Sequence, residues 1–212
     1  MVGRFKKYRR ILAVAETLVI VVVLVSLCVM ATPKFLELKK NARKQSLDTI
    51  ALQLEKNSRF VRAQAFLKGM LFSNNKYYIV CLNGFTNERC NREGYNNDII
   101  STDMIIVQKG YPFSGLHEAV AVATLLGYHY QSTSYSELRK SISDEIPIFP
   151  TCDGYCHISD LKNVCNAPFC LQESREGTLV VPQGLSASDN CYVRYYHSGQ
   201  NLPVIAIENG GC

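Results

Sequence analysis

Nine cysteines are the residues of this chain whose type and spacing most directly suggest chemistry. Cys28 lies inside a long apolar run, and eight more follow it: Cys81, Cys90, Cys152, Cys156, Cys165, Cys170, Cys191 and Cys212. An even set of this kind, in a domain outside the cytoplasm, indicates up to four disulfides in an oxidising compartment such as the bacterial periplasm. Because Cys81 and Cys90 are close in sequence, we expect them to pair. The four middle cysteines, at 152 to 170, are expected to pair among themselves, in any of three connectivities.

A zinc site is the alternative for these middle cysteines. Cys152 and Cys156 are followed by His157, and Cys165 and Cys170 come soon after, so thiolate and imidazole ligands are near one another in sequence. The cysteines of each pair are separated by three and four residues, unlike the C-x2-C pairs of most zinc sites. Oxidation to disulfides would also compete with metal. Disulfides are therefore favoured, and no metal or other cofactor is expected.

Catalysis has little support. The histidines are scattered along the chain, at His117, His129, His157 and His197, and disulfide formation would remove the thiol nucleophiles. No G-x-S-x-G, P-loop or H-E-x-x-H pattern is present. We therefore expect a structural or binding protein and not an enzyme.

Glu16 is the one charged residue of the apolar run from Ile11 to Met30. These twenty residues are long enough, as a helix, to cross the roughly 30 Å hydrocarbon core of a bilayer. A secretory signal peptide is the alternative, but its apolar region is usually about 7 to 15 residues long and ends in a small-residue cleavage site. Residues 28–31, Cys-Val-Met-Ala, make a poor site of that kind. The sequence therefore predicts a transmembrane helix over residues 11–31.

The flanking charges suggest an orientation for this helix. Five basic residues precede the run: Arg4, Lys6, Lys7, Arg9 and Arg10. The positive-inside rule then places residues 1–10 in the cytoplasm as a basic tail, and everything after Ala31 outside it. Of 23 Lys and Arg and 18 Asp and Glu, the tail holds five bases and the run one acid, which leaves 18 bases against 17 acids. Because the remainder is nearly neutral, nucleic acid is not an expected partner.

The helical pattern continues beyond the predicted span. Apolar residues recur at helical spacing to about Leu67, and Gly69 is a plausible stop, so we predict an amphipathic extension of the helix over residues 32–69. The apolar positions are Phe35, Leu38, Ala42, Leu47, Ile50, Ala51, Leu54, Val61 and Ala65. Pro33 removes one backbone donor and disfavours helix at Thr32, which predicts a kink between the two halves without a break.

Short strands dominate the remaining residues, 70–212, which form the predicted head domain. Strands are expected over 77–82, 103–107, 178–181, 190–196 and 203–207, with a helix over 116–126 and a polar, cysteine-rich loop over 131–176. Hairpin-linked strands after one long helix predict an α+β domain. In such a domain a single antiparallel sheet would cover the apolar stripe of the helix.

Three stretches of the chain resemble the type IV pilins, and among them the mannose-sensitive haemagglutinin (MSHA) type. Glu16 followed by residues 33–36, Pro-Lys-Phe-Leu, is similar to the N-terminal helix of that family. Residues 109–112, Lys-Gly-Tyr-Pro, are similar to its central segment, and residues 190–195 with Gly211-Cys212 are similar to its C-terminal disulfide loop. The resemblance implies the pilin fold, in which the long helix packs on an antiparallel head, and a Cys191–Cys212 disulfide.

The resemblance also implies partners. Glu16 would meet the free amine of a neighbouring subunit as helices bundle into a filament, which offsets the cost of burying its carboxylate. The alternative is that Glu16 reaches the headgroups or turns toward Arg9. The implied partners are other pilin subunits, the inner membrane and the pilus assembly machinery. The implied location is the bacterial inner membrane, with the head in the periplasm or on a pilus at the cell surface.

One position departs from the family pattern. Pilin precursors normally carry glycine directly before the first mature residue, four residues ahead of the glutamate, where a prepilin peptidase cuts. Here Ile11 stands in place of that glycine, and Leu12 would be the first mature residue. Three explanations are open: a pilin-like protein that stays in the membrane, a minor subunit processed atypically, or a misassigned start.

Two candidate functions follow from the sequence. One is a structural or minor pilin for pilus assembly and surface attachment, and the other is a membrane-resident periplasmic binding or sensor protein on the same scaffold.

Overall fold

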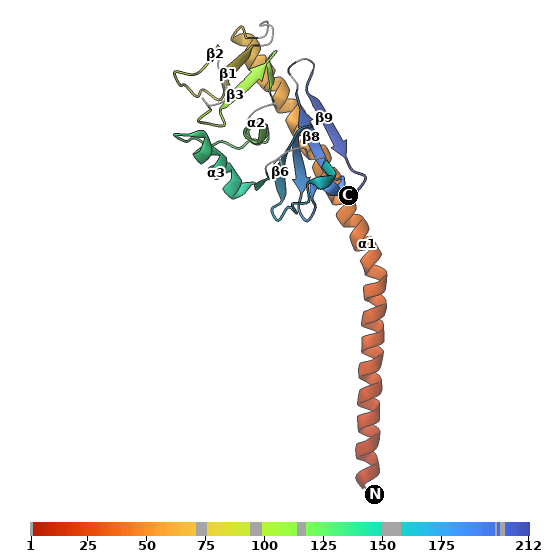
Figure 1. Cartoon of the computed structure of the whole chain (residues 1–212). Helices are drawn as coiled ribbons and strands as arrows, with labels where there is room; N and C mark the ends of the chain where they lie inside the picture. The colour runs from red at the N-terminus through yellow and green to blue at the C-terminus, as the bar shows by residue number, and fades with distance from the viewer. Residues whose placement is uncertain are drawn as a thin grey trace. The chain divides into compact units, whose positions relative to one another are not determined.

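The computed structural model describes residues 2–70, 76–93, 99–113, 118–149, 158–197, 199 and 202–212, with side chains from Glu16 onward except Glu118 and Ser159. It divides into two compact units, Met1–Arg43 and Lys44–Cys212. Helix α1 (Val2–Leu67) belongs to both units (Figure 1).

The first unit consists of α1 alone. Its most apolar 18-residue window has a mean hydropathy of 2.4 and none of it is buried, and among the described residues α1 is the one helix long and apolar enough to cross a membrane. The Ser26 hydroxyl donates to the Val22 carbonyl (2.8 Å) and the Thr32 hydroxyl to that of Cys28 (2.7 Å), so both polar side chains are satisfied within the helix. Pro33 lies inside a continuous helix, as expected. The kink stays a prediction.

The second unit covers one face of α1 from Leu47 onward. Leu47, Ile50, Leu54, Val61 and Ala65 are buried in the main core. The first residues of the predicted apolar stripe are not part of this core, since Phe35 and Leu38 are each 67% exposed and Ala42 is exposed. The step of five residues from Ala42 to Leu47 explains the difference. At 3.6 residues per turn such a step rotates the side chain by about 140°, so the two sets lie on different faces of an ideal helix.

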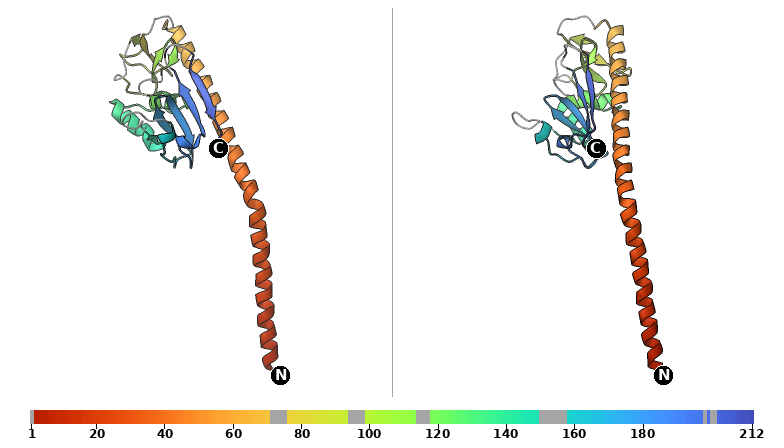
Figure 2. Two further views of the ribbon diagram at one scale, coloured as in Figure 1. Left: turned by 45° about the vertical axis from the view of Figure 1, so that its right-hand side comes forward. Right: turned by 90° about the vertical axis from the view of Figure 1, so that its right-hand side faces the viewer.

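Two sheets, and not the single sheet expected, pack on this helix (Figure 2). The first has the strand order β2-β1-β3-β4 and the second the order β5-β6-β7-β8-β9. All neighbouring strands are antiparallel except β5 and β6, which are parallel. The strands are β1 Tyr77–Cys81, β2 Arg92–Glu93, β3 Met104–Gln108, β4 Tyr111–Pro112, β5 Ile148–Phe149, β6 Phe169–Ser174, β7 Gly177–Pro182, β8 Tyr192–Tyr196 and β9 Val204–Glu208. The α+β class is confirmed.

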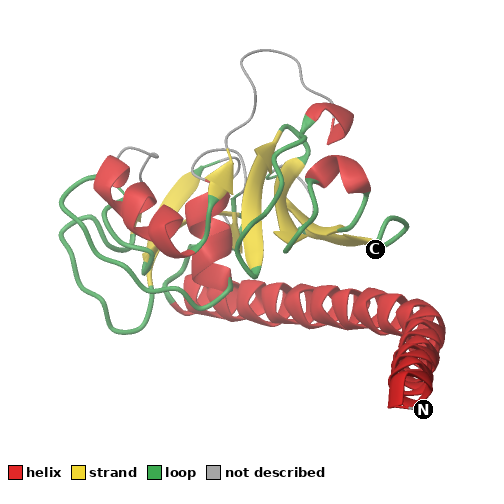
Figure 3. Cartoon of the chain, turned by 90° about the horizontal axis from the view of Figure 1, so that it is seen from below, coloured by secondary structure: helices red, strands yellow, loops and turns green. Residues whose placement is uncertain are grey.

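Helix α2 (Glu118–Leu125) lies between the two sheets and joins their cores (Figure 1). It is apolar all round, with Val120, Val122 and Leu125 buried, as expected for a helix enclosed by other elements. Gln53 and Asn57 of α1 donate to the carbonyls of Leu126 (2.8 Å) and Leu125 (2.7 Å) at its C-terminal end. Residues 44–67 of α1, both sheets and α2 therefore share one core, with the strands along one side of α1 (Figure 3).

The prediction of a loop over 131–176 is wrong. The segment contains α3 (Tyr135–Glu145), β5, a 3₁₀ turn η2 (Ile158–Asp160) and β6. Ser134 caps α3 by accepting from the Glu137 amide, and hydrogen bonds donated by Thr133 and Ser132 hold the pKa of the Glu137 carboxyl below its usual value. Only Leu138 and Ile142 of α3 are buried, too short an apolar pattern to stand out in a polar sequence.

A second, smaller core covers the other face of β6–β8. Leu179 and Val181 of β7 point into it, whereas Val180 between them points into the main core. Leu161, Cys165, Cys170, Ala187 of η3 (Ala187–Asp189) and Tyr192 complete this second core. With both faces covered, β7 is buried along its whole length, which explains its unbroken apolar sequence Leu-Val-Val.

Truncating Leu54 should test the contribution of α1 to the head. Leu54 is fully buried and Leu52, two residues earlier, is 67% exposed. We expect Leu54→Ala to lower the free energy of unfolding of the head by about 2–5 kcal/mol, and Leu52→Ala to change it by less than about 0.5 kcal/mol. Urea unfolding followed by circular dichroism measures both. Equal effects would show that the head does not pack on this face of α1.

Candidate functional site

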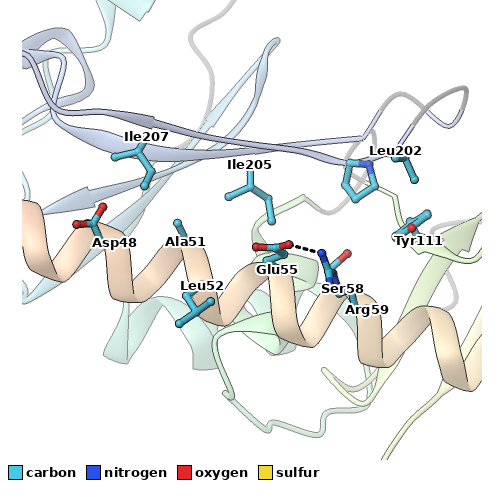
Figure 4. A pocket seen from close by; sticks show the side chains of 11 residues that line it. Asp48, Ala51, Leu52, Glu55, Ser58, Arg59, Tyr111, Leu202, Ile205 and Ile207 are labelled. Atoms are coloured by element: carbon cyan, nitrogen blue, oxygen red, sulfur yellow. Dashed lines mark hydrogen bonds and ion pairs between the residues drawn. The ribbon is translucent and has the colours of Figure 1, made fainter.

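The most prominent cavity among the described residues is a groove between α1 and the edge strand β9 (Figure 4). Its volume is about 540 Å³. Asp48, Leu52, Glu55 and Arg59 of α1 line one wall, and Ile205 and Ile207 of β9 point toward α1 from the other. Leu202 and Tyr111 lie at one end of the groove (Figure 4).

The register of the C-terminal hairpin creates this groove. Ile205 and Ile207 pair with Tyr195 and Val193 of β8, so they face the same side of the sheet as those two buried residues. Tyr195 and Val193 pack in the main core, whereas Ile207 is 37% exposed and Ile205 is half-buried. β9 therefore extends the sheet beyond the part that α1 fills. An edge strand of this kind, with neither lysine nor proline within it, is well suited to contact another molecule.

The charges of the helix wall are few. Glu55 and Arg59 form an i,i+4 ion pair at 2.6 Å on an exposed surface, and a pair of this kind stabilises a helix by about 0.3–0.5 kcal/mol. Asp48 adds one more carboxylate, so the wall carries one net negative charge. The groove therefore combines a few charged side chains of α1 with apolar side chains of both walls. Such a mixed lining fits the surface of another protein better than a small charged ligand.

The turn between β3 and β4 closes one end of the groove. Lys109 and Gly110 both have positive φ, 51° and 82°, which a two-residue type I′ hairpin turn requires. The turn brings the Tyr111 ring to 4.6 Å from the Arg62 guanidinium of α1, which also donates to the Tyr111 hydroxyl. The Tyr195 hydroxyl donates to the Pro112 carbonyl at 2.9 Å, and burial raises the pKa of that hydroxyl, so it stays protonated. The turn thereby ties both sheets to α1.

The chain's C-terminal residues hold β8 and β9 in place. Cys212 is bonded to Cys191, and the Gly211 amide donates to the Asn190 carbonyl at 3.1 Å. Asn190 adopts a left-handed backbone (φ 54°), which lets residues 186–190 turn back toward Gly211. A disulfide that closes a loop of 21 residues stabilises a fold by about 3 kcal/mol in chain-entropy estimates. The strand wall of the groove is thus anchored covalently.

The described residues contain three disulfides. Cys81–Cys90 and Cys191–Cys212 are the two expected pairs. The third, Cys165–Cys170, joins two of the four middle cysteines, which were expected to pair among themselves. Their Cα atoms are 5.0–5.6 Å apart, in the usual range. Cys152 and Cys156 lie outside the described residues. Cys28 is a free, exposed thiol in the apolar part of α1.

The other residues singled out in the sequence do not converge on this groove. Glu16 is exposed on α1 in the first unit, and Ile11 and Leu12 are helical, without described side chains. The contact of Glu16 with another subunit stays a prediction. The groove itself was not predicted from the sequence. No local pattern marks it, because Leu52 and Leu202 each stand beside other apolar residues in the sequence.

The histidines have separate environments. His129 Nδ1 lies 3.1 Å from the Asp103 carboxylate, at the surface, whereas His197 is buried beside the rings of Tyr111 and Phe113. His117 and His157 lie outside the described residues. Within the described ranges no group of three or more His, Cys, Asp or Glu side chains could hold a metal ion.

Two of the three pilin-like stretches meet in the head, where residues 109–112 border the groove and the loop of residues 190–212 anchors its strand wall. The third, from Glu16 to residue 36, lies along α1. Comparison of the chain with protein-family models, with curated proteins and with solved structures found no significant match.

Neighbouring glycines allow a matched test of the C-terminal anchor. A Cβ added to Gly211 would lie 1.5 Å from the Asp189 carbonyl oxygen, whereas one added to Gly210 would meet nothing within 4 Å. Gly211→Ala should therefore push the last residues away from the loop 189–190 and lower the free energy of unfolding by about 1–3 kcal/mol. Gly210→Ala should change it by less than about 0.5 kcal/mol.

Urea unfolding and limited proteolysis of the C-terminal hairpin measure the difference. If Gly211→Ala were as stable and as protease-resistant as Gly210→Ala, the close packing of the C-terminal residues on this loop would be wrong.

Proposed function

We propose that this chain is a type IV pilin-like subunit, anchored in a membrane by α1, that takes part in pilus assembly and surface attachment. One observation carries the proposal. A single continuous helix leaves a span of apolar side chains uncovered and then becomes the core helix of a disulfide-bonded α+β head. The resemblance at Glu16 and residues 33–36, in the turn at 109–112 and in the C-terminal loop supports the same family.

The disulfides favour a head outside the cytoplasm. Charge alone does not decide the orientation, because five basic residues precede the apolar run and five more follow it: Lys34, Lys39, Lys40, Arg43 and Lys44. Disulfides form and persist in oxidising compartments and are rare in the cytosol. The head in the periplasm and residues 1–10 in the cytoplasm are therefore the proposed topology.

Glu16 is the proposed assembly residue. It is an acid within a helix stretch that has no covering from its own chain, so its carboxylate is costly in a bilayer unless a partner or the interface receives it. A basic group on a second copy would reduce that cost. The groove beside β9 is the proposed contact surface of the head, because it combines an unpaired strand edge with exposed apolar side chains.

One observation favours a second candidate. Ile11 stands where pilin precursors carry the glycine of the cleavage junction, and a chain left uncut would gain no new amine for Glu16 to meet. The second candidate is therefore a membrane-resident protein with the same scaffold, whose head binds a periplasmic ligand or senses one.

Removing the carboxylate of Glu16 tests the assembly role. Glu16→Ala should leave membrane insertion intact or slightly favour it, because an acid is removed from the apolar segment, but it should lower the yield of crosslinked oligomers and of subunits in sheared surface material. Glu37→Ala is the matched control, since Glu37 is an exposed glutamate of the same helix beyond the span. Carbonate extraction measures insertion. Assembly that is equal in both variants would remove Glu16 from the proposed interface.

A further inference from the structure

We propose that four basic residues of α1, Lys34, Lys39, Lys40 and Arg43, form a collar that binds anionic lipid headgroups at the surface of the bilayer. The collar is in the first unit, directly after the apolar run. The inference rests on the membrane anchoring proposed above, and adds to it a selective partner, an anionic phospholipid surface.

Charge is the first argument for the collar. Within residues 34–43 the four bases face one acid, Glu37, which leaves a net charge of +3 in ten residues. The chain beyond its first ten residues and its apolar run is close to neutral as a whole. The lysines of the collar are exposed and Arg43 is half-buried. Clusters of four or more Lys and Arg on the cytoplasmic side of a transmembrane helix are typical of segments that bind anionic lipids, and the same electrostatic attraction acts at any bilayer surface that carries anionic headgroups.

Distance is the second argument. The apolar run ends near Ala31, so at 1.5 Å per residue Lys34 lies about 5 Å, and Lys39 to Arg43 about 12–18 Å, beyond the hydrocarbon core along the helix. The headgroup layer takes up roughly 5–8 Å of that distance, and the Debye length at physiological salt is about 8 Å. Lysine and arginine side chains extend several ångströms further toward the surface. All four charges are therefore close enough to interact with the headgroups.

The third argument is the arrangement of side chains around the helix. Phe35 and Leu38, both 67% exposed, share one face with Ala42 on an ideal helix. Lys34 and Lys39 flank this face on either side, Lys40 lies opposite it and Arg43 lies between Lys39 and Lys40, so the four bases surround the rest of the helix. The apolar face is not the one that packs in the head, which begins at Leu47. Basic side chains on several sides of a helix that crosses the bilayer can all reach surrounding headgroups, because long basic side chains extend toward the interface.

The position of the collar also opposes the usual charge rule. Bases that follow the span weaken the preference for a cytoplasmic tail, since each flank then carries equal numbers of Lys and Arg.

A second copy is a poorer partner for the collar than lipid. The helix wall of the groove, formed by Asp48, Glu55 and Arg59, offers one net negative charge against three net positive charges. An anionic bilayer surface matches the collar in both charge and position.

The absence of tryptophan from the chain allows a site-specific test. The full-length chain with Phe35→Trp is reconstituted in phosphatidylcholine vesicles that contain a trace of dansyl-labelled phosphatidylglycerol or dansyl-labelled phosphatidylcholine. Energy transfer from this tryptophan should be greater to the anionic lipid, and the excess should fall as salt is raised. The tryptophan at position 35 and the basic residues 4–10 lie at opposite ends of the apolar span. Labelled lipids bound by residues 4–10 therefore contribute little to the energy transfer.

Charge variants then identify the residues responsible. Lys39→Gln/Lys40→Gln should remove about half of the excess transfer, because two of the four bases are lost. The control Lys140→Gln/Lys162→Gln neutralises two exposed lysines of the head and should leave the excess unchanged. Equal transfer to both lipids in the parent, or an excess that survives Lys39→Gln/Lys40→Gln, would overturn the collar. Loss of crosslinking between copies in that variant, with no change in lipid preference, would assign the collar to a protein contact and overturn it equally.

Carbonate extraction of the same vesicles separates the two proposals. A chain that is released by carbonate is not anchored, and both the collar and the proposed function fail. A chain that stays embedded without a lipid preference overturns the collar alone.

Discussion

The rest of the structure depends on the uncovered apolar stretch of α1. Eleven large apolar side chains between Leu18 and Met30 are each more than half exposed, and nothing described in the chain covers them. Leaving them in water would cost on the order of 10 kcal/mol, which is comparable to the whole stability of a small domain. A bilayer, a bundle of like helices, or both in succession would remove this cost, and the proposed function uses these environments. A pilin-like subunit uses both environments, and a resident membrane protein uses only the first.

The same helix also organises the head, through a change of face. Between Ala42 and Leu47 the apolar positions move to another side of α1, and from Leu47 onward they form the core with both sheets and α2. This explains why one helix can present an apolar face outside the head and a buried stripe within it. Because the core occupies only one face of α1, the flank with Leu52 and Glu55 is not filled by the head, and the groove lies between this flank and β9.

Local patterns predicted the long helix, α2 and several of the strands, but not the elements within residues 131–176 or the assembly of the head. The long helix followed from apolar spacing, and β1, β3, β7, β8 and β9 followed from short apolar runs bounded by turn residues, because each signal is contained in neighbouring residues. The turn at Lys109-Gly110 was likewise expected from neighbouring residues alone. Two disulfide pairs were also expected correctly, one from proximity and one from resemblance.

Features that depend on distant contacts could not be found in this way. The division into two sheets and the parallel pairing of β5 with β6 are set by contacts across the fold, and α3 has only two buried apolar residues in a polar sequence. The groove results from the register of β8 and β9 relative to α1, for which no single stretch carries a signal. Glu16, Pro33 and the bases of the collar were visible as residue types. The roles proposed for Glu16 and the collar involve a membrane or a second copy, and the kink at Pro33 stays a prediction.

The most direct test of the account is the mass of the N-terminal peptide of the mature chain, measured separately in membranes and in sheared surface material. A pilin-like subunit predicts a chain that begins at Leu12, four residues ahead of Glu16, in the surface fraction. A chain confined to the membrane fraction, with residues 4–10 still attached and no peptide that begins at Leu12, would contradict assembly into a pilus and leave the resident membrane protein as the function of this scaffold.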